Sequence, residues 1–377
     1  MKIAFIYDAP YPWHIGGIEA IINNEARELA KENEVHFFSL KWPSMNRHFV
    51  NEEIRYHAFH ETNQTKLYRH GRRSIREACI FGFGLVRLFG YRFDVVITDA
   101  FPFLHLPIIK LYCKISNAKL IIRVDEAWDK KYWKDYLGLF VGALSNVYSD
   151  HIIRGADWYI ANSGATVEGF RKKGLDQSRM SIFAPVIDNA LLGGIKKRKR
   201  EKRIIFSGRF IKEKRIDKLL DVMDRVSRKR KDIKAVIVGK GPEKEEIVKK
   251  AKHLKLDGTV RILEFFQKKK DLYNMIASSS VFLQMSEREG LSIITLESLS
   301  LGTPVIIPEY SPLPKEIKEM CIQVPENRIA DEIIKVAESR DKKRFIRNVK
   351  ELRIFSTSEI KRFYSDVFEN IGLEEES

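Results

Sequence analysis

Short apolar, β-branched runs alternate with helical patterns along the first half of the chain. The pattern predicts seven strands, at 2–8, 34–40, 54–59, 94–100, 119–125, 158–163 and 180–185. Helical spacing of apolar residues fills most of the gaps between them. Strands that alternate with helices form a parallel sheet covered on both faces, because each crossover helix packs back on the sheet. We therefore expect a doubly wound α/β domain that binds its ligand at the carboxyl ends of the strands.

The second half repeats this alternation and predicts a second domain of the same class. Strands are expected at 203–207, 233–238, 260–265, 281–286 and 304–308, and helices at 215–226, 243–254, 268–276, 293–301 and 356–370. The basic run KKRKREKR at 196–203 is interpreted as a solvated interdomain linker. The expected layout is an N-terminal domain over 1–195, this linker, and a C-terminal domain over 204–355.

The stretch EREGLSIITLESLSLGTPVI joins a predicted strand to a predicted helix. Glu289 stands in the turn, and Glu297 stands about one and a half helical turns further on. The free amides of Gly290, Leu291 and Ser292 and the positive end of the helix dipole suit an anionic ligand. The alternative is that both glutamates are ordinary surface residues in water. The predicted helix is apolar on most sides, however, which favours a functional role for the Glu297 carboxylate.

Two cations, Arg209 and Lys214, follow the first strand of the second half in the sequence GRFIKEKR. A strand-to-helix loop places such side chains where they reach a ligand held above the sheet. A guanidinium grips phosphate oxygens in a fork and an ammonium adds a point charge, so the pair suits a diphosphate. The alternative is a pair of ordinary surface bases.

Three further strand ends carry candidate binding residues. Gly16 and Gly17 open the first helix and let the backbone come close to a ligand. Gly239 and Gly241 form only Gly-x-Gly, without the third glycine of a dinucleotide fingerprint, and predict a tight turn near a nucleotide. Asp125 ends a buried strand, at the edge where substrates bind in this fold class. The alternative for Asp125 is a structural role as the cap of the following helix.

The formal net charge of +16 implies an anionic partner. Lysines and arginines interleave with apolar residues over 66–91, as in a basic amphipathic helix that lies on an anionic membrane surface. In that interpretation Arg69, Arg72, Arg73 and Arg76 face the membrane. The alternative is that the apolar side belongs to the domain core and the arginines are solvated.

Composition bears on the compartment and on bound metals. Three widely separated cysteines suggest neither a redox pair nor a metal knuckle, and a reducing cytoplasm is the simplest compartment. The nine histidines do not cluster in the sequence, so no metal is expected.

The basic run at 196–203 lacks the interleaved aromatic residues of proteins that bind single-stranded nucleic acid, so nucleic acid is not expected as a partner. The longest apolar stretch, 78–86, is too short to span a bilayer. We expect a cytoplasmic protein, soluble or peripheral to the cytoplasmic face of the membrane.

Five motifs, taken in order, give the chain a resemblance to a known family. They are GGIE at 16–19, NSGAT at 162–166, GRFIKEK at 208–214, GKGP at 239–242, and the Glu-x7-Glu motif EGLSIITLE followed by GTPVI. The set resembles the retaining nucleotide-sugar glycosyltransferases of family four over nearly the whole chain. The resemblance implies the GT-B fold, with two Rossmann-like doubly wound parallel-sheet domains facing a central cleft. It also implies that the C-terminal segment 356–377 crosses back onto the first domain.

The resemblance implies roles for single residues. The donor site would consist of Gly16, Gly17, Arg209, Lys214, Gly239, Gly241, Gly290, Leu291, Ser292 and Glu297. In it Arg209 and Lys214 bind the diphosphate and Glu297 binds the ribose hydroxyls. Glu289 touches the transferred sugar, so it joins the two cations as a catalytic candidate. Asp125, the fourth such candidate, stands where many members have a histidine near the reacting centre.

The implied reaction moves a sugar from a nucleotide-diphosphate sugar to an acceptor hydroxyl with retention of anomeric configuration. Positive groups and helix amides stabilise the departing nucleoside diphosphate, and neither a metal nor another cofactor is needed. The expected acceptor is a glycan or lipid-linked acceptor of cell-surface glycan or glycolipid synthesis. The alternatives are a GT-B epimerase or phosphorylase, and a non-catalytic protein that binds polyanions or membranes on a decayed transferase fold.

Overall fold

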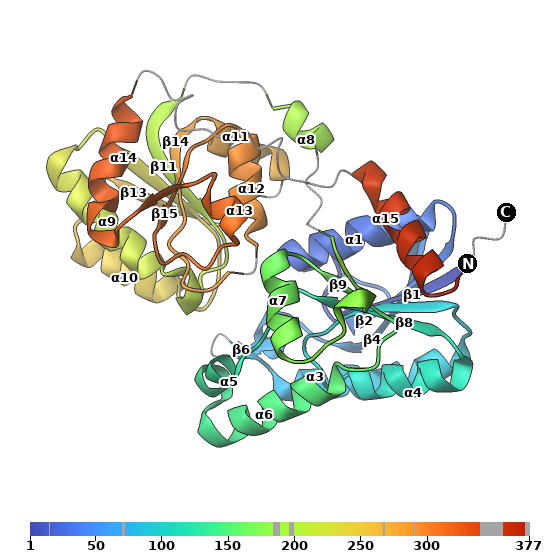
Figure 1. Ribbon diagram of the computed structural model, residues 1–377. Helices are drawn as coiled ribbons and strands as arrows, with labels where there is room; N and C mark the ends of the chain where they lie inside the picture. Colours follow the sequence, from blue (N-terminus) through green and yellow to red (C-terminus); the bar gives the residue numbers. More distant parts are fainter. Residues whose placement is uncertain are drawn as a thin grey trace. The chain divides into compact units, whose positions relative to one another are not determined.

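A computed structural model gives the fold of the chain (Figure 1). The structure describes residues 1–14, 16–69, 72–183, 189–195, 200–266, 268–289, 291–339 and 357–373. The chain forms two compact units. Unit 1 is Met1–Val186 with Phe355–Ser377, and unit 2 is Ile187–Ile354. The boundary between them falls somewhat earlier in the chain than the predicted one.

Unit 1 is built on an eight-stranded sheet in the order β10-β9-β8-β7-β1-β2-β4-β3. Its strands are β1 (Lys2–Ile6), β2 (Glu34–Lys41), β3 (His48–Asn51), β4 (Ile54–Glu61), β7 (Val95–Asp99), β8 (Lys119–Val124), β9 (Trp158–Ala161) and β10 (Met180–Ile182). The seven predicted strands are present and pair in parallel. β3 pairs antiparallel with β4. It was not predicted, because its side chains are largely exposed and leave no apolar run.

Helices cover both faces of this sheet (Figure 1). One face carries α1 (Gly17–Ala30) and α15 (Thr357–Asn370). The other face carries α3 (Ile75–Gly84), the 3-10 helix η1 (Leu85–Gly90), α4 (Leu106–Ser116) and α6 (Leu139–Ile152). The remaining helices of unit 1 are α2 (Gln64–Leu67), α5 (Lys130–Leu137), α7 (Gly164–Lys172) and the 3-10 helix η2 (Gln177–Arg179). Right-handed crossovers explain why α1 and α4 cover opposite faces. The chain moves along the sheet in one direction from β1 to β2 and in the opposite direction from β7 to β8, so the connecting helices pack on opposite sides.

Unit 2 has an all-parallel six-stranded sheet in the order β13-β12-β11-β14-β15-β16. Its strands are β11 (Glu201–Ser207), β12 (Lys234–Val238), β13 (Val260–Leu263), β14 (Ser279–Leu283), β15 (Val305–Pro308) and β16 (Ile322–Val324). Its helices are α8 (Asn189–Gly193), η3 (Lys212–Lys214), α9 (Ile216–Lys229), α10 (Lys244–His253), α11 (Lys269–Ala277), α12 (Ile293–Ser300), α13 (Lys315–Lys318), η4 (Glu326–Arg328) and α14 (Ile329–Glu338). The short, half-exposed β16 was not predicted. Both units confirm the predicted class of Rossmann-like doubly wound domains.

The predicted basic linker is wrong for its last residues. Glu201, Lys202 and Arg203 are the first residues of β11. The Glu201 N–H donates to Ser278 O at 2.8 Å, and Arg203 Nη2 donates to Ser278 Oγ at 2.6 Å. The backbone of these residues therefore joins the sheet while their charged side chains find water or polar partners. Residues 196–199 of the predicted linker lie outside the described part of the chain.

The single amphipathic helix predicted over 66–91 is also wrong, while the membrane contact predicted for this segment stays a prediction. The segment contains, in order, the end of α2, a hairpin of β5 (Tyr68–Arg69) and β6 (Arg72–Arg73), then α3 and η1. Arg72 and Arg76 are exposed, but Arg73 is buried and pairs with the buried Asp8. The hairpin turns Arg73 inward because its partner lies at the end of β1, far away in sequence. Among the helices in the described ranges, none is long and apolar enough to span a bilayer.

Three histidines meet in unit 1, although they are widely spaced in the sequence. His36 Nδ1 lies 2.8 Å from His57 Nε2, and His48 Nδ1 lies 3.3 Å from His57 Nδ1. Pairing of β2, β3 and β4 brings them together. Burial lowers the pKa of His57 to about 4 and also lowers the pKa of His36. In the part of the chain that the structure describes, no group of three or more His, Cys, Asp or Glu side chains is arranged to hold a metal ion.

Unit 1 is expected to lose stability as the pH falls from about 6.5 to about 4. Burial holds the pKa of His57 in the folded state below its ordinary value of 6.5. Above pH 6.5 the imidazole is neutral in both states, whereas between pH 6.5 and about 4 the unfolded state binds a proton that the folded state excludes, so the free energy of unfolding falls. We expect a loss of about 1–3 kcal/mol from this residue.

Tryptophan fluorescence during urea unfolding measures this loss, because all five tryptophans lie in unit 1. The free energy of unfolding should be lower at about pH 4.5 than at pH 7. In the His57→Gln variant the difference between the two pH values should shrink. A difference as large as in the wild type would assign the pH dependence to other groups.

Candidate functional site

Two loops of unit 2 meet at the carboxyl ends of β11 and β14. The Glu287 N–H donates to Glu213 O at 2.9 Å. Lys214 pairs with Glu289, and Arg215 pairs with Glu287. The side chains of Lys214 and Glu289 are only 18% and 10% exposed. The fold therefore brings one predicted diphosphate-binding cation together with the first glutamate of the Glu-x7-Glu motif.

The second glutamate of the motif, Glu297, is buried on α12 with 3% exposure. Tyr273 Oη donates to Glu297 Oε1 at 2.5 Å, and Lys269 Nζ lies 2.6 Å from the same oxygen. The alternative of a glutamate in water is therefore wrong for Glu297. Sequence reasoning missed both partners, although their i, i+4 spacing on a predicted helix was a usable signal. Lys269 Nζ also lies 5.2 Å from the centre of the Tyr273 ring, which fixes the two side chains together.

Arg209 lies on the exposed loop between β11 and η3. This loop packs on the turn after β12, where the Phe210 N–H donates to Lys240 O at 2.9 Å. A Cβ on Gly239 or Gly241 would collide with the backbone of the Arg209 loop. The two glycines therefore let the two loops approach each other, and they position Arg209 through its backbone. Their contact with a nucleotide stays a prediction.

Ser292 caps the N-terminus of α12 in the left-handed region, with a φ of 57°. Glycine adopts this backbone conformation most easily, so a serine here needs contacts that hold it. Here the Ser292 Oγ accepts from Gln284 Nε2 at 3.2 Å and lies 2.9 Å from Thr295 Oγ1. These hydrogen bonds hold a conformation that few other side chains tolerate. Leu291 is buried, and Gly290 lies outside the described residues.

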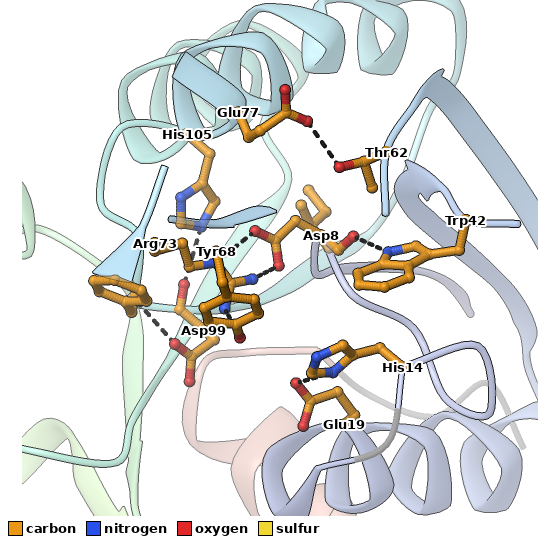
Figure 2. Close-up of polar contacts among 12 residues, drawn as sticks. Asp8, His14, Glu19, Trp42, Thr62, Tyr68, Arg73, Glu77, Asp99 and His105 are labelled. Carbon is orange, nitrogen blue, oxygen red and sulfur yellow. Dashed lines mark hydrogen bonds and ion pairs between the residues drawn. The ribbon is translucent and has the colours of Figure 1, made fainter. Parts of the chain in front are cut away.

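Three acidic residues of unit 1 lie at the carboxyl ends of neighbouring strands. Asp8 follows β1, Asp99 ends β7, and Asp125 follows β8. Figure 2 shows Asp8 facing Arg73, whose Nε donates to Asp8 Oδ2 at 3.0 Å. Arg73 Nη1 also donates to Tyr68 Oη at 3.1 Å. The positive charge of Arg73 compensates the negative charge of the buried Asp8. Sequence reasoning missed this pair because it joins distant segments of the chain.

Asp99 is a buried carboxyl group with a raised pKa. Its Oδ1 accepts from the Phe101 N–H at 2.8 Å, and its carbonyl oxygen lies 3.0 Å from His105 Nε2. Burial, and next the neighbouring Asp125 carboxylate, raise the pKa of Asp99 well above its ordinary value. Asp99 therefore binds a proton more readily than an ordinary aspartate does.

Asp125 is held at the end of β8 by two residues of the NSGAT motif. Asn162 Nδ2 donates to the Asp125 carbonyl at 2.8 Å, and Thr166 Oγ1 donates to the same carbonyl at 3.3 Å. One carboxylate oxygen of Asp125 lies 4.0 Å from Arg123 Nη2. The alternative that Asp125 caps the next helix is wrong, because Asp129 caps α5.

Gly16 and Gly17 lie at the start of α1. A Cβ on Gly16 would collide with the carboxylate of Glu19, which folds back over it. The Glu19 Oε1 lies 2.9 Å from His14 Nδ1, and both side chains are buried (Figure 2). A carboxylate in the first turn of a helix interacts favourably with the helix dipole, as a phosphate would. Donor binding at these glycines stays a prediction, and Glu19 would compete with the donor there.

Two protein-family models match consecutive parts of the chain. The model described as Glycosyltransferase Family 4 matches residues 15–191. The model described as Glycosyl transferases group 1 matches residues 192–352. The change from one model to the other falls close to the boundary between unit 1 and unit 2. Together the two models account for most of the chain.

Curated relatives are similar over about a third of the chain. An uncharacterized glycosyltransferase of Haemophilus influenzae is 31% identical over 140 residues, 37% of this chain and 39% of that protein. The N-acetyl-alpha-D-glucosaminyl L-malate synthase of Bacillus anthracis is 26% identical over 146 residues, 37% of each protein. A GDP-mannose-dependent alpha-(1-6)-phosphatidylinositol dimannoside mannosyltransferase of Mycobacterium tuberculosis is 29% identical over 110 residues, 29% of this chain and 28% of that protein. The matches thus span well under half the length of these relatives.

Solved structures share the fold over nearly the whole chain. Anabaena Alr3699/HepE, solved in complex with UDP, has a TM-score of 0.71 at 15% identity, covering 98% of this chain and 100% of that chain. Sucrose-phosphate synthase from Thermosynechococcus elongatus has a TM-score of 0.78 at 16% identity, covering 98% of each chain. At such low identity the likeness concerns the fold alone. With the two family models beside this fold, the chain belongs to the family-four glycosyltransferases of the GT-B fold.

Proposed function

We propose that the protein transfers a sugar from a nucleotide-diphosphate sugar to an acceptor hydroxyl, with retention of configuration and without a metal. The contact between Lys214 and Glu289 carries this proposal, because it joins the loops at the carboxyl ends of β11 and β14. It sets a cation for phosphate oxygens beside a carboxylate for sugar hydroxyls. Solved structures of Anabaena Alr3699/HepE contain UDP or UDP-glucose, which supports a nucleotide sugar as the donor.

The arrangement suits the stabilisation of a leaving diphosphate. Arg209 and Lys214 bind its oxygens, and the N-terminus of α12 adds the positive end of a helix dipole. Glu297, held by Tyr273 and Lys269 through one oxygen, binds the ribose hydroxyls with the other. As the bond from the sugar to the diphosphate breaks, the acceptor oxygen attacks the same face and its proton passes to the diphosphate. Groups that are already in place meet the developing negative charge.

We assign the acceptor hydroxyl to the strand ends of unit 1 that carry Asp99 and Asp125. The carboxyl oxygens accept hydrogen bonds from a hydroxyl, and the raised pKa of Asp99 favours a form that also donates one. The Mycobacterium tuberculosis relative is named for a phosphatidylinositol dimannoside substrate, which supports a glycan or lipid-linked acceptor. The cysteines Cys79, Cys113 and Cys321 are free, which supports a reducing, cytoplasmic location.

The Arg209→Ala variant is expected to bind UDP or GDP about ten- to a hundredfold more weakly, because a charge-assisted hydrogen bond to phosphate is lost. Isothermal titration calorimetry against UDP- and GDP-sugars measures the change and identifies the nucleobase. Arg228→Ala is the matched control, since the Arg228 side chain on α9 is 75% exposed. Equal affinity of Arg209→Ala and the wild type would remove Arg209 from the donor site.

Product analysis separates transfer from the alternative reactions. A transferase consumes the donor fastest when an acceptor is present, an epimerase converts it without any acceptor, and a non-catalytic protein leaves it unchanged. The anomeric configuration of the product by NMR tests retention. Full activity in EDTA tests independence from a metal.

A further inference from the structure

Helix α6 exposes several of its large apolar side chains, while Gly142 and Ser149 are buried. Phe140, Leu144 and Val147, spaced i, i+4, i+7, are 84%, 73% and 69% exposed. The buried positions of the same helix are Gly142 and Ser149. A surface helix normally turns its apolar stripe toward the core, so α6 shows the reverse arrangement. A contiguous exposed stripe of this kind marks a binding surface.

The orientation of α6 is fixed by its packing on α5. A Cβ on Gly142 would collide with the backbone of Trp133, so only glycine allows this close approach. Trp133 Nε1 donates to Ser149 Oγ at 3.1 Å, and Tyr148 Oη donates to Phe103 O at 3.4 Å. These contacts hold the side of α6 that carries Gly142, Tyr148 and Ser149 inward. The apolar stripe is therefore held at the surface by the fold.

Further exposed apolar residues lie on α3, η1 and α4, which contact one another, and α3 and α4 lie on the same side of the sheet as α6 (Figure 1). Of the fourteen exposed large apolar residues in the described chain, eleven lie on these elements and α6. They are Ile75, Phe83, Val86, Phe89, Leu111, Ile115, Leu139, Phe140, Val141, Leu144 and Val147. We call this set the apolar face. Its concentration on one side of unit 1 separates it from the single exposed apolar residues of ordinary surfaces.

Basic residues accompany the apolar face. The helices α3, η1, α4, α5 and α6 carry seven basic residues, Arg76, Arg87, Lys110, Lys114, Lys130, Lys131 and Lys134, against three acidic ones, Glu77, Asp135 and Asp150. Lysine is depleted at the centre of protein interfaces, whereas anionic lipid headgroups attract it. Apolar side chains flanked by lysines match the boundary between headgroups and acyl chains.

We propose that the apolar face docks unit 1 on an anionic lipid bilayer. Phe140, Leu144 and Val147 enter the acyl region, and Lys130, Lys131 and Lys134 of the adjoining α5 contact the headgroups. This surface shares α3 and η1 with the predicted segment 66–91, but it adds α4, α5 and α6, and the buried Arg73 takes no part in it. The inference does not rest on the transferase reaction, and it is tested without any substrate.

Flotation with lipid vesicles tests the proposal. The wild type is expected to float with vesicles of phosphatidylcholine containing about a third phosphatidylglycerol, and less with phosphatidylcholine alone. The triple variant Phe140→Ser, Leu144→Ser and Val147→Ser should partition at least about tenfold more weakly. Val50→Ser with Ile182→Ser is the matched control, since these side chains are 67% and 46% exposed on β3 and β10. Changing Lys130, Lys131 and Lys134 to Glu should abolish the preference for anionic vesicles.

Three results would overturn the proposal. The first is a wild type that does not float with anionic vesicles, and the second is a triple variant that floats as well as the wild type. The third is a lipid-free dimer of the wild type that the triple variant loses, since the apolar face would then be an interface between two copies. Unchanged urea unfolding of the triple variant, followed by tryptophan fluorescence, ensures that lost flotation reports the surface.

Discussion

The Lys214→Ala variant is expected to transfer sugar with a kcat/KM about 10²- to 10³-fold below that of the wild type. A loss of this size accompanies removal of one group that stabilises developing negative charge in a site shielded from water. The Lys214 side chain is 18% exposed, so its charge acts in a partly desolvated position. Its pairing with Glu289 holds it at the loop junction before any ligand binds. Steady-state kinetics with the donor identified by calorimetry measures the change.

Two further variants decide how Lys214 acts. If it binds the diphosphate directly, Lys214→Ala should weaken binding of the free nucleoside diphosphate, which has no sugar. Glu289→Gln should leave that affinity unchanged and lower only the affinity for the complete nucleotide sugar. If Lys214 only holds Glu289 in place, both variants should keep full affinity for the nucleoside diphosphate, and the proposed role of Lys214 would be wrong.

A lysine–glutamate pair elsewhere in unit 2 gives the matched control. Lys244 pairs with Glu264 at 2.7 Å, and these side chains are 44% and 71% exposed. Lys244→Ala removes the same charge from the same unit, but an exposed pair contributes little to stability. Its kcat/KM should stay within about twofold of the wild type. A large loss in this control would show that the net charge of the unit, and not Lys214 itself, governs the rate.

The Arg123→Met variant is expected to destabilise unit 1 by about 3–5 kcal/mol. Arg123 Nη1 of β8 donates to Glu25 Oε1 of α1 at 2.5 Å, and Tyr364 of α15 donates to the other oxygen of Glu25 at 2.8 Å. All three side chains are buried. Loss of the arginine leaves the Glu25 carboxylate buried without its countercharge. Because Tyr364 depends on that carboxylate, the docking of α15 should weaken as well.

A contact between α15 and the residues just after α1 gives the control for this prediction. Lys361 of α15 pairs with Glu32 at 2.6 Å, and both side chains are about half exposed. Lys361→Ala should cost less than about 1 kcal/mol. Adding Glu25→Leu to Arg123→Met removes both buried charges and should restore part of the stability. Urea unfolding followed by tryptophan fluorescence reports unit 1 in each case, and an Arg123→Met variant as stable as the wild type would contradict the prediction.

Most strands and helices followed from local patterns. Buried parallel strands such as β7 and β12 are continuous apolar runs, which stand out against the polar helices between them. The missed strands β3 and β16 are short, lie at sheet edges and are partly exposed. Their formation depends on a neighbouring strand that offers free backbone groups. The prediction for segment 66–91 was wrong because the spacing of its basic and apolar residues fits one amphipathic helix as well as it fits the observed hairpin and two helices.

The candidate site was only partly readable. Spacing placed Lys214 and Glu289 on two strand-to-helix loops, but only the pairing of β11 with β14 brings those loops together. The pattern marked Glu297 as an unusual carboxylate on an apolar helix, while its burial under Tyr273 and Lys269 depends on how α11 packs on α12. Asp125 was found at a strand end, whereas its neighbour Asp99 was not.

The sequence by itself determined the alternation of strands and helices and hence two doubly wound domains with ligand groups at their strand ends. It did so because apolar periodicity and turn residues act within a few neighbours along the chain. Only the tertiary structure decided which charges meet, such as Arg73 with Asp8 and Arg123 with Glu25, and which face of α6 stays exposed. These choices depend on contacts between residues far apart in sequence, where burial makes an unpaired charge costly and a well-placed partner decisive.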